Sequence, residues 1–249
     1  MAKASGLGDQ LYVDGNDLGG DINSLNAIRG GNSPLMMTDI TQLANARLGG
    51  KRDGEFTFTS YFDPAALRSH ASFSALPTTD RLASYGHGVV AGNAIANLIA
   101  KQINYDGNRA DDGSFLLGVN AQSNSFGLEW CQQLTAGKLT QGAAGNVAGL
   151  DLGSASPGSF GGQLYYHLFA FAGTSVTLKI QHSNDNGSGD PYADVAGWTT
   201  TALVAAPASG RIAVTGLAIK QWLRVVSVGT FTNAQFLVSA VRNPVQTDF

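Results

Sequence analysis

The residues that could carry acid–base or metal chemistry are few and scattered along this chain. Its 249 residues include four histidines, one cysteine and two glutamates. No two histidines have the HxH or HxxxH spacing that would place a pair of metal ligands on one strand or one helix face. We therefore expect no metal, no cofactor and a structural role for each histidine. The histidines are His70, His87, His167 and His182.

Carboxylate chemistry has one candidate pair. A glycoside hydrolase needs two carboxylic acids facing one cleft. Glu55 and Glu129 both fall on predicted strands and could meet across a sheet, so this alternative stays open. The chain has no Gly-x-Ser-x-Gly nucleophile motif, and the glycine-rich bend at 85–88 lacks a phosphate-binding pattern. We predict that the protein is not an enzyme and has no catalytic residues.

Two oxygen-rich loops superficially resemble calcium sites. One contains Asp106, Asp111 and Asp112, and the other is Asn184–Asp190. Neither has the ligand spacing and closing glutamate of an EF-hand loop, so we interpret both as solvated turns. Cys131 has no possible disulfide partner within the chain, and we expect a small, semi-buried side chain there.

Charge and composition limit the possible partners. Charged residues make up 13% of the chain, glycines number 32, and the net charge is −3. Lys51-Arg52 is followed by Asp53 and Glu55, so no basic run is present that would hold phosphates. Residues 1–150 contain ten basic and thirteen acidic residues, whereas residues 151–249 contain five of each. Low charge with many glycines is typical of an all-β protein in an assembly.

The elements that would position these residues are mostly strands. In residues 101–130, apolar residues alternate with polar ones over 115–121 and 126–130, with a predicted hairpin turn at 122–125. Residues 55–62 form another alternating strand, and Asp14-Gly15 predicts a tight turn. Two short helices are expected, one within Ser33–Gly50 and one over Ala65–Leu76 ended by Pro77. The first helix would cover its own sheet or dock onto another subunit.

Composition divides the chain into three parts. Residues 1–138 are expected to form a β-sandwich or barrel with one flanking helix. Residues 139–162 are rich in Gly, Ala and Ser and are interpreted as a linker. Residues 163–249 contain about six short strands and predict a β-sandwich of immunoglobulin-like or jelly-roll-like type. We expect no signal sequence, no membrane span and assembly in a cytosol.

Several motifs together resemble the major tail proteins, or tail-tube proteins, of long-tailed bacteriophages (siphoviruses). They are Leu11–Leu18, Gly50–Gly54, Phe58–Pro64, Lys101–Gly107 and Gly127–Trp130, with Val176–Gln181 and Leu223–Val226 resembling the appended β-sandwich of that family. The resemblance covers most of the chain, and its motifs are strand and turn patterns.

The resemblance implies a structural virion protein. Its copies would form rings, normally hexameric, that stack into a tail tube whose negative channel conducts DNA without specific binding. Partners would be further copies and other tail proteins: the tape measure, the tail terminator and the baseplate or tip. The location would be the phage tail, after assembly in the host cytoplasm.

The resemblance also implies site residues. The inter-ring loop would be Ser33–Gly54, with candidates Met36, Ile40, Leu43, Arg47, Lys51 and Arg52. The channel-lining acidic candidates are Asp53, Glu55, Asp106, Asp111, Asp112 and Glu129. Two alternatives stay open: a capsid or tail decoration protein or a virion protein that binds a host surface or glycan, and a secreted glycan-active enzyme.

Overall fold

The computed structural model describes residues 5–76 and 79–245. Nearly all of its regular structure is antiparallel β-strand. Among the described residues there is one α-helix, α1 (Ser69–Phe73), and one 3-10 turn, η1 (Gly19–Asp21). The prediction of a mainly β protein is confirmed. No helix among the described residues is long and apolar enough to cross a membrane.

The chain forms two compact units, each assembled from separated segments. Unit 1 comprises residues 1–19, 84–96 and 130–249, and unit 2 comprises residues 20–83 and 97–129. Strands β5 (Arg81–Gly86) and β6 (Ala94–Arg109) each contribute residues to both units. The domain boundaries expected from composition, at residues 138 and 163, stay a prediction.

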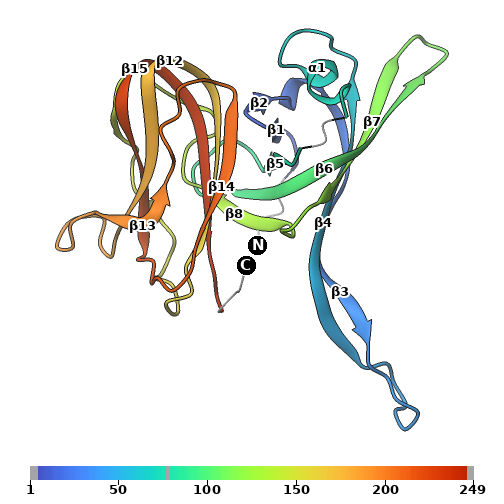
Figure 1. The fold of residues 1–249 in the computed structure, drawn as a ribbon, viewed down its shortest axis with the longest axis horizontal. Helices are drawn as coiled ribbons and strands as arrows, with labels where there is room; N and C mark the ends of the chain where they lie inside the picture. Colours follow the sequence, from blue (N-terminus) through green and yellow to red (C-terminus); the bar gives the residue numbers. More distant parts are fainter. Residues whose placement is uncertain (1–4, 77–78, 246–249) are drawn as a thin grey trace. The chain divides into compact units, whose positions relative to one another are not determined.

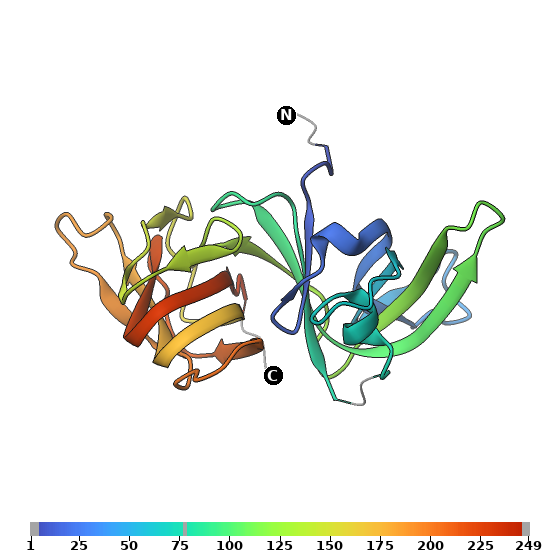
Figure 2. The ribbon, with the colours of Figure 1, turned by 90° about the horizontal axis from the view of Figure 1, so that it is seen from above.

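Unit 1 is built on two long strands, β12 (Gly162–Ser183) and β15 (Trp222–Arg242), which pair over their whole length. Strand β12 also pairs with β13 (Ala193–Thr199) and β14 (Ala208–Val214), and β15 pairs with β8 (Glu129–Gln133). Trp198 and Phe236 are fully buried in the core of this unit. Figures 1 and 2 show β12 to β15 in yellow-orange to red and β8 in yellow-green.

The segment interpreted as a linker is ordered against unit 1. It contains β9 (Leu139–Gln141), β10 (Gly145–Asn146) and β11 (Leu150–Asp151), and all three pair with β15. Strands of two or three residues are too short to produce a period-two pattern, which is why composition did not reveal them.

The first hairpin of unit 1 follows the sequence prediction. Strands β1 (Gln10–Val13) and β2 (Asn16–Asp17) pair through Val13 and Asn16, leaving Asp14-Gly15 as a two-residue loop. Both loop residues have positive φ, 50° and 77°. This is the backbone geometry that Asp-Gly favours in a tight hairpin.

Unit 2 is a twisted sheet in which β3 (Ile22–Met36), β4 (Arg47–Tyr61), β7 (Phe115–Ser123) and β6 pair in that order. The alternation in β4 places Phe56 and Phe58 on the buried face. Phe73 of α1 packs against Phe58, with ring centroids 5.5 Å apart. The sheet therefore has one apolar face and one polar face.

Three local predictions were wrong. Ser33–Gly50 contains no helix: its ends belong to β3 and β4, because cross-strand pairing overrides a helical spacing of apolar residues. Residues 122–125 do not join a paired hairpin, since β7 pairs with β4 and β6 while β8 pairs with β15 and β6. The helix expected over Ala65–Leu76 is shortened to α1, and Pro77 lies outside the described residues.

Candidate assembly surface

The distal half of the β3–β4 hairpin, residues 30–53, is named the arm here. Strand β4 pairs with β7 from Glu55 to Tyr61, and among the described strands β3 pairs with β4 alone. Beyond Gly54 the hairpin is therefore two-stranded, as Figure 1 shows at its lower end. A lone two-stranded hairpin is marginally stable in water, so this geometry favours a covering partner.

The arm displays apolar side chains to solvent. Every residue from 29 to 45 is exposed. Ile40 and Leu43 at the tip are fully exposed, and four further large apolar residues are at least half exposed: Leu35, Met36, Met37 and Leu48. Burying one such side chain contributes roughly 1.5–3 kcal/mol. A large apolar surface of this kind marks an interaction site.

The tip is an ordered turn. The Thr38 hydroxyl accepts the Ala46 N–H at 2.9 Å, and the Asp39 carboxylate accepts the N–H and hydroxyl of Thr41 at 2.8 and 2.6 Å. The hydrogen bonds from Thr41 lower the pKa of Asp39 below its usual range. These bonds fix the turn that presents Ile40 and Leu43.

The side chain of Arg52 connects the base of the arm to the last two residues of unit 2. Arg52 donates to the Glu129 carboxylate at 3.2 Å and to the Leu128 carbonyl. Glu129 is buried, so this predicted channel residue presents no free carboxylate on the subunit surface. Arg47 and Lys51 are exposed. All six predicted inter-ring residues thus lie on the arm.

The polar face of the sheet carries two predicted channel acids near the base of the arm. Glu55 accepts hydrogen bonds from Arg29 at 3.0 Å, Thr57 at 2.9 Å and Asn120 at 2.5 Å. The bonds from Thr57 and then Arg29 lower the pKa of Glu55. Asp53 accepts from the Ser123 hydroxyl at 2.8 Å, which lowers the pKa of Asp53. Both carboxylates are therefore ionised at neutral pH.

The other predicted acids lie toward the opposite end of the sheet. Asp106 on β6 is paired with Gly118, which in turn is paired with Thr59, so the register places Asp106 on the face that carries Glu55. Asp111 and Asp112 lie in the exposed β6–β7 loop, where the Ser114 N–H lowers the pKa of Asp112. The sheet thus gathers Asp53, Glu55 and Asp106 on one face.

The structure gives no support to a glycosidase pair. Glu55 and Glu129 belong to separate ion pairs, one with Arg29 and one with Arg52. Within the described residues no group of three or more His, Cys, Asp or Glu side chains could hold a metal ion.

One Ser–His contact in unit 1 is structural. His167 is buried, its Nδ1 accepts the Gly15 N–H at 3.1 Å, and its Nε2 lies 2.8 Å from the Ser84 hydroxyl. Because Nδ1 accepts, the ring proton is on Nε2 and is donated to Ser84. This histidine therefore cannot take the serine proton, and neither side chain reaches solvent.

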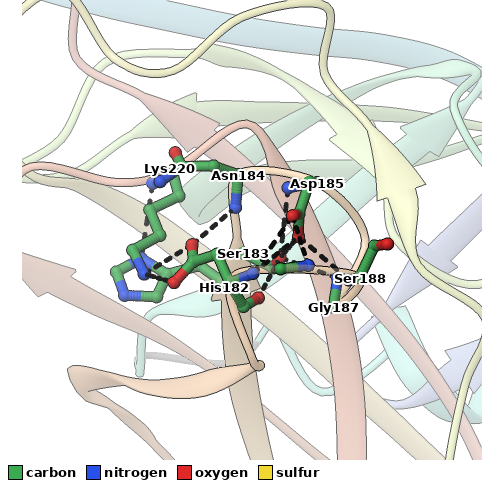
Figure 3. Close-up of polar contacts among 9 residues, drawn as sticks. His182, Ser183, Asn184, Asp185, Gly187, Ser188 and Lys220 are labelled. Carbon is green, nitrogen blue, oxygen red and sulfur yellow. Dashed lines mark hydrogen bonds and ion pairs between the residues drawn. The ribbon is translucent and has the colours of Figure 1, made fainter.

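The loop at 184–190 is likewise not a cation site. The Asp185 carboxylate accepts backbone N–H groups of Ser188, Gly189 and Asp190, and the Asp190 carboxylate accepts Lys220 Nζ at 2.7 Å (Figure 3). A site whose carboxylates are surrounded by N–H donors has no free oxygens for a cation. The interpretation as a solvated turn fits these bonds.

Sequence reasoning missed part of the arm. Leu35, Met37 and Leu48 were not selected, because the segment was interpreted as containing a short helix with apolar residues at three-to-four spacing. The free edge of β3 was also not foreseen. The glycine pairs Gly30-Gly31 and Gly49-Gly50, which flank the exposed segment, were a possible signal of a hairpin.

No family model and no curated protein matches the chain. Among solved structures it is similar to the Dit (gp 19.1) protein of phage SPP1, described as a paradigm of the hub adsorption apparatus in phages that infect Gram-positive bacteria. That match has 11% identity and a TM-score of 0.33 and covers 94% of this chain and 99% of that one. A chain of the phage P2 baseplate in its activated conformation with Ca has 12% identity, a TM-score of 0.33 and coverage of 95% and 99%. At such TM-scores the likeness carries no argument, so the function rests on the residues of this chain.

Proposed function

We propose that this protein is a structural subunit of a phage tail, polymerising as stacked rings into the tail tube. The observation that supports the proposal is the arm. It is a two-stranded hairpin with six exposed apolar side chains and no buried residue between 29 and 45. Such a hairpin gains its stability when another copy covers it.

Two features of unit 2 suit ring and stack formation. The free edge of β3 presents unpaired N–H and C=O groups, and a neighbouring strand would pair with them. The arm would then reach a copy in the adjacent ring. Contacts of this head-to-tail type close into rings or continue as filaments, depending on the rotation between copies.

The polar face of the unit 2 sheet is the proposed lining of the channel. Its carboxylates Asp53, Glu55 and Asp106 share this face with uncharged Thr57, Thr59 and Asn120. The register also places Arg29 and Lys101 on it, and both are ion-paired, Arg29 with Glu55 and Lys101 with Asp80. An acidic face without free basic clusters repels the DNA backbone, so DNA would pass without binding. Glu129 is left out of this proposal because its carboxylate is buried and paired.

The proposal includes the other partners expected from the family resemblance. The tube would end on tail-terminator and baseplate or tip proteins and enclose a tape-measure protein. The virion tail would be the final location, with assembly in the host cytoplasm. No cofactor takes part.

Electron microscopy of the concentrated protein tests the proposal. Wild-type protein is expected to form hollow tubes or stacked rings. The double variant Ile40→Ser/Leu43→Ser is expected to stay folded, because both side chains are fully exposed, and to lose the tubes. The matched control is Val204→Ser, a half-exposed apolar residue of unit 1, which should still form tubes.

The opposite result has a definite meaning. If the wild-type protein stays monomeric at high concentration, and also does not polymerise when preformed tail tips are added, the tube proposal is overturned. The remaining candidate would then be a decoration protein that binds a host-surface glycan.

A further inference from the structure

Unit 2 has a second exposed apolar surface at the end of its sheet opposite the arm. It is formed by the rings of Phe62, His70, Tyr105 and Phe115 and is named the aromatic socket here. Phe62 lies 4.6 Å from His70 and 5.5 Å from Phe115 between ring centroids, and His70 Nδ1 lies 2.9 Å from the Tyr105 hydroxyl. Phe62 is 42% exposed and Phe115 is 38% exposed.

The socket is held in shape by the surrounding strands. The Phe115 ring lies so close over β6 that a Cβ on Gly107 would come within 2.9 Å of it. On the other side, α1 supplies His70, whose N–H donates to the Asp63 carbonyl. The exposed rings are therefore part of a built surface and do not belong to a loose loop.

The arm and the socket cannot meet within one chain. Arg47 at the start of β4 lies on the arm, and Tyr61 at its end adjoins Phe62 of the socket. A strand of this length separates its ends by roughly 45 Å. Figure 1 shows the arm and the β6–β7 hairpin at opposite ends of unit 2.

The charges at the two ends are complementary. The distal part of the arm, residues 33–51, carries two basic residues, Arg47 and Lys51, and one acidic residue, Asp39. Around the socket, acidic side chains outnumber the basic side chains of Arg68 and Arg109. These carboxylates are Asp63, Asp111 and Asp112. An apolar tip with a basic stem thus fits an aromatic surface with an acidic rim.

We infer that the aromatic socket binds the arm tip of a second copy of this chain, head to tail. Ile40 and Leu43 would pack against Phe62 and Phe115, while Arg47 and Lys51 approach the acidic β6–β7 loop. The inference rests on the proposed function and deepens it by naming the receiving surface. Because donor and acceptor surfaces differ, each copy would both give an arm and receive one.

Disulfide trapping tests the pairing in the full-length protein. Ala44→Cys is placed beside Leu43, and Ser114→Cys beside Phe115; both positions are exposed, and the native Cys131 is buried. A variant with both substitutions is expected to form a ladder of covalent oligomers on mild oxidation during assembly. Mixing the two single variants should give a dimer with one chain of each. The matched control, Ala44→Cys with Ala196→Cys on β13, should give no ladder.

A substitution in the socket gives an independent test. Phe115→Ser is expected to raise the concentration needed for half-assembly by at least about tenfold. Assembly is measured below the melting temperature of the variant, because the ring is only 38% exposed and also packs within its own chain. Trp130→Ser, which removes a similarly exposed aromatic ring of unit 1, is the control and should assemble normally.

The possible results distinguish failure of the socket inference from failure of the proposed tube function. Tubes that form without a ladder, together with normal assembly of Phe115→Ser, overturn the socket and leave the proposed function intact. Crosslinking of Ala44→Cys to itself would show an arm-to-arm contact and also overturn the socket. Failure of wild-type protein to form any tube overturns both.

Discussion

At the residue scale, the interior of unit 1 depends on one buried histidine. His167 joins the Asp14-Gly15 turn to Ser84 on β5, so three segments distant in sequence meet at one ring. Its burial lowers the pKa of the imidazole to about 3. A ring that must stay neutral makes unit 1 sensitive to acid.

The first prediction concerns this pH dependence. The unfolded chain binds a proton at His167 below its ordinary pKa of about 6.5, whereas the folded chain does not until about 3. Stability is therefore full above pH 6.5 and falls as the pH is lowered toward 3, by up to about 1.4 kcal/mol per pH unit. Denaturant unfolding of wild type and His167→Asn between pH 6.5 and 4.5 should show a flatter dependence in the variant. Equal slopes would contradict the prediction.

The second prediction concerns the turn that His167 holds. Gly15 has φ of 77°, and a Cβ there would lie 2.7 Å from the Ala208 nitrogen and 2.8 Å from the Leu168 carbonyl oxygen. Gly15→Ala is therefore expected to lower the free energy of unfolding by about 1–3 kcal/mol. Gly20→Ala is the control, since no atom lies within 4 Å of its Cβ position. Equal melting temperatures for the two variants would refute this account.

At the element scale, β15 organises unit 1 by pairing with five other strands: β8, β9, β10, β11 and β12. The glycine-rich segment at 139–162 is held to it in part by one side chain. The buried Ser227 hydroxyl donates to Gln141 at 2.5 Å and accepts the Gly145 N–H at 3.1 Å. Order in this segment therefore comes from its contacts with β15 and not from its own composition.

The third prediction is that Ser227→Ala loosens this segment. Loss of the hydroxyl leaves two polar groups without their partner and should cost about 1–2 kcal/mol. Hydrogen exchange at residues 139–147 is expected to accelerate more than exchange in β12. Ser154→Ala, at an exposed serine, should leave exchange unchanged. Uniform acceleration across unit 1 would argue against a local role for Ser227.

At the scale of the whole molecule, charge decides how the protein meets DNA. The net charge is −3, and the proposed channel face carries ionised Asp53 and Glu55. The fourth prediction is that wild-type subunits do not retain duplex DNA at 50 mM salt. The double variant Asp53→Lys/Asp106→Lys should bind it, with an affinity at least roughly tenfold above the upper limit set by the wild type, and the binding should vanish as salt rises. Fluorescence anisotropy measures both, and DNA binding by the wild type would contradict the channel proposal.

Sequence alone determined the class of the protein and several of its local features. Period-two alternation in Glu55–Phe62 and Phe115–Ala121 identified strands with one buried face, because side chains of a strand alternate between faces. Asp14-Gly15 identified a turn, because few other residue pairs accept positive φ at both positions. From the residues alone, Ile40 and Leu43 could cover their own sheet or dock onto another subunit, and only the family resemblance favoured the second alternative.

Only the tertiary structure decided which strands pair and which surfaces stay open. Strands β7 and β8 are adjacent in sequence yet do not pair with each other: β7 lies between β4 and β6, and β8 lies between β15 and β6. The spacing of Ile40, Leu43 and Arg47 belongs to a hairpin and not to a helix. Local patterns report the periodicity of a segment, whereas pairing depends on contacts between residues far apart in the chain. The free edge of β3, the buried carboxylate of Glu129 and the aromatic socket all arise from such distant contacts.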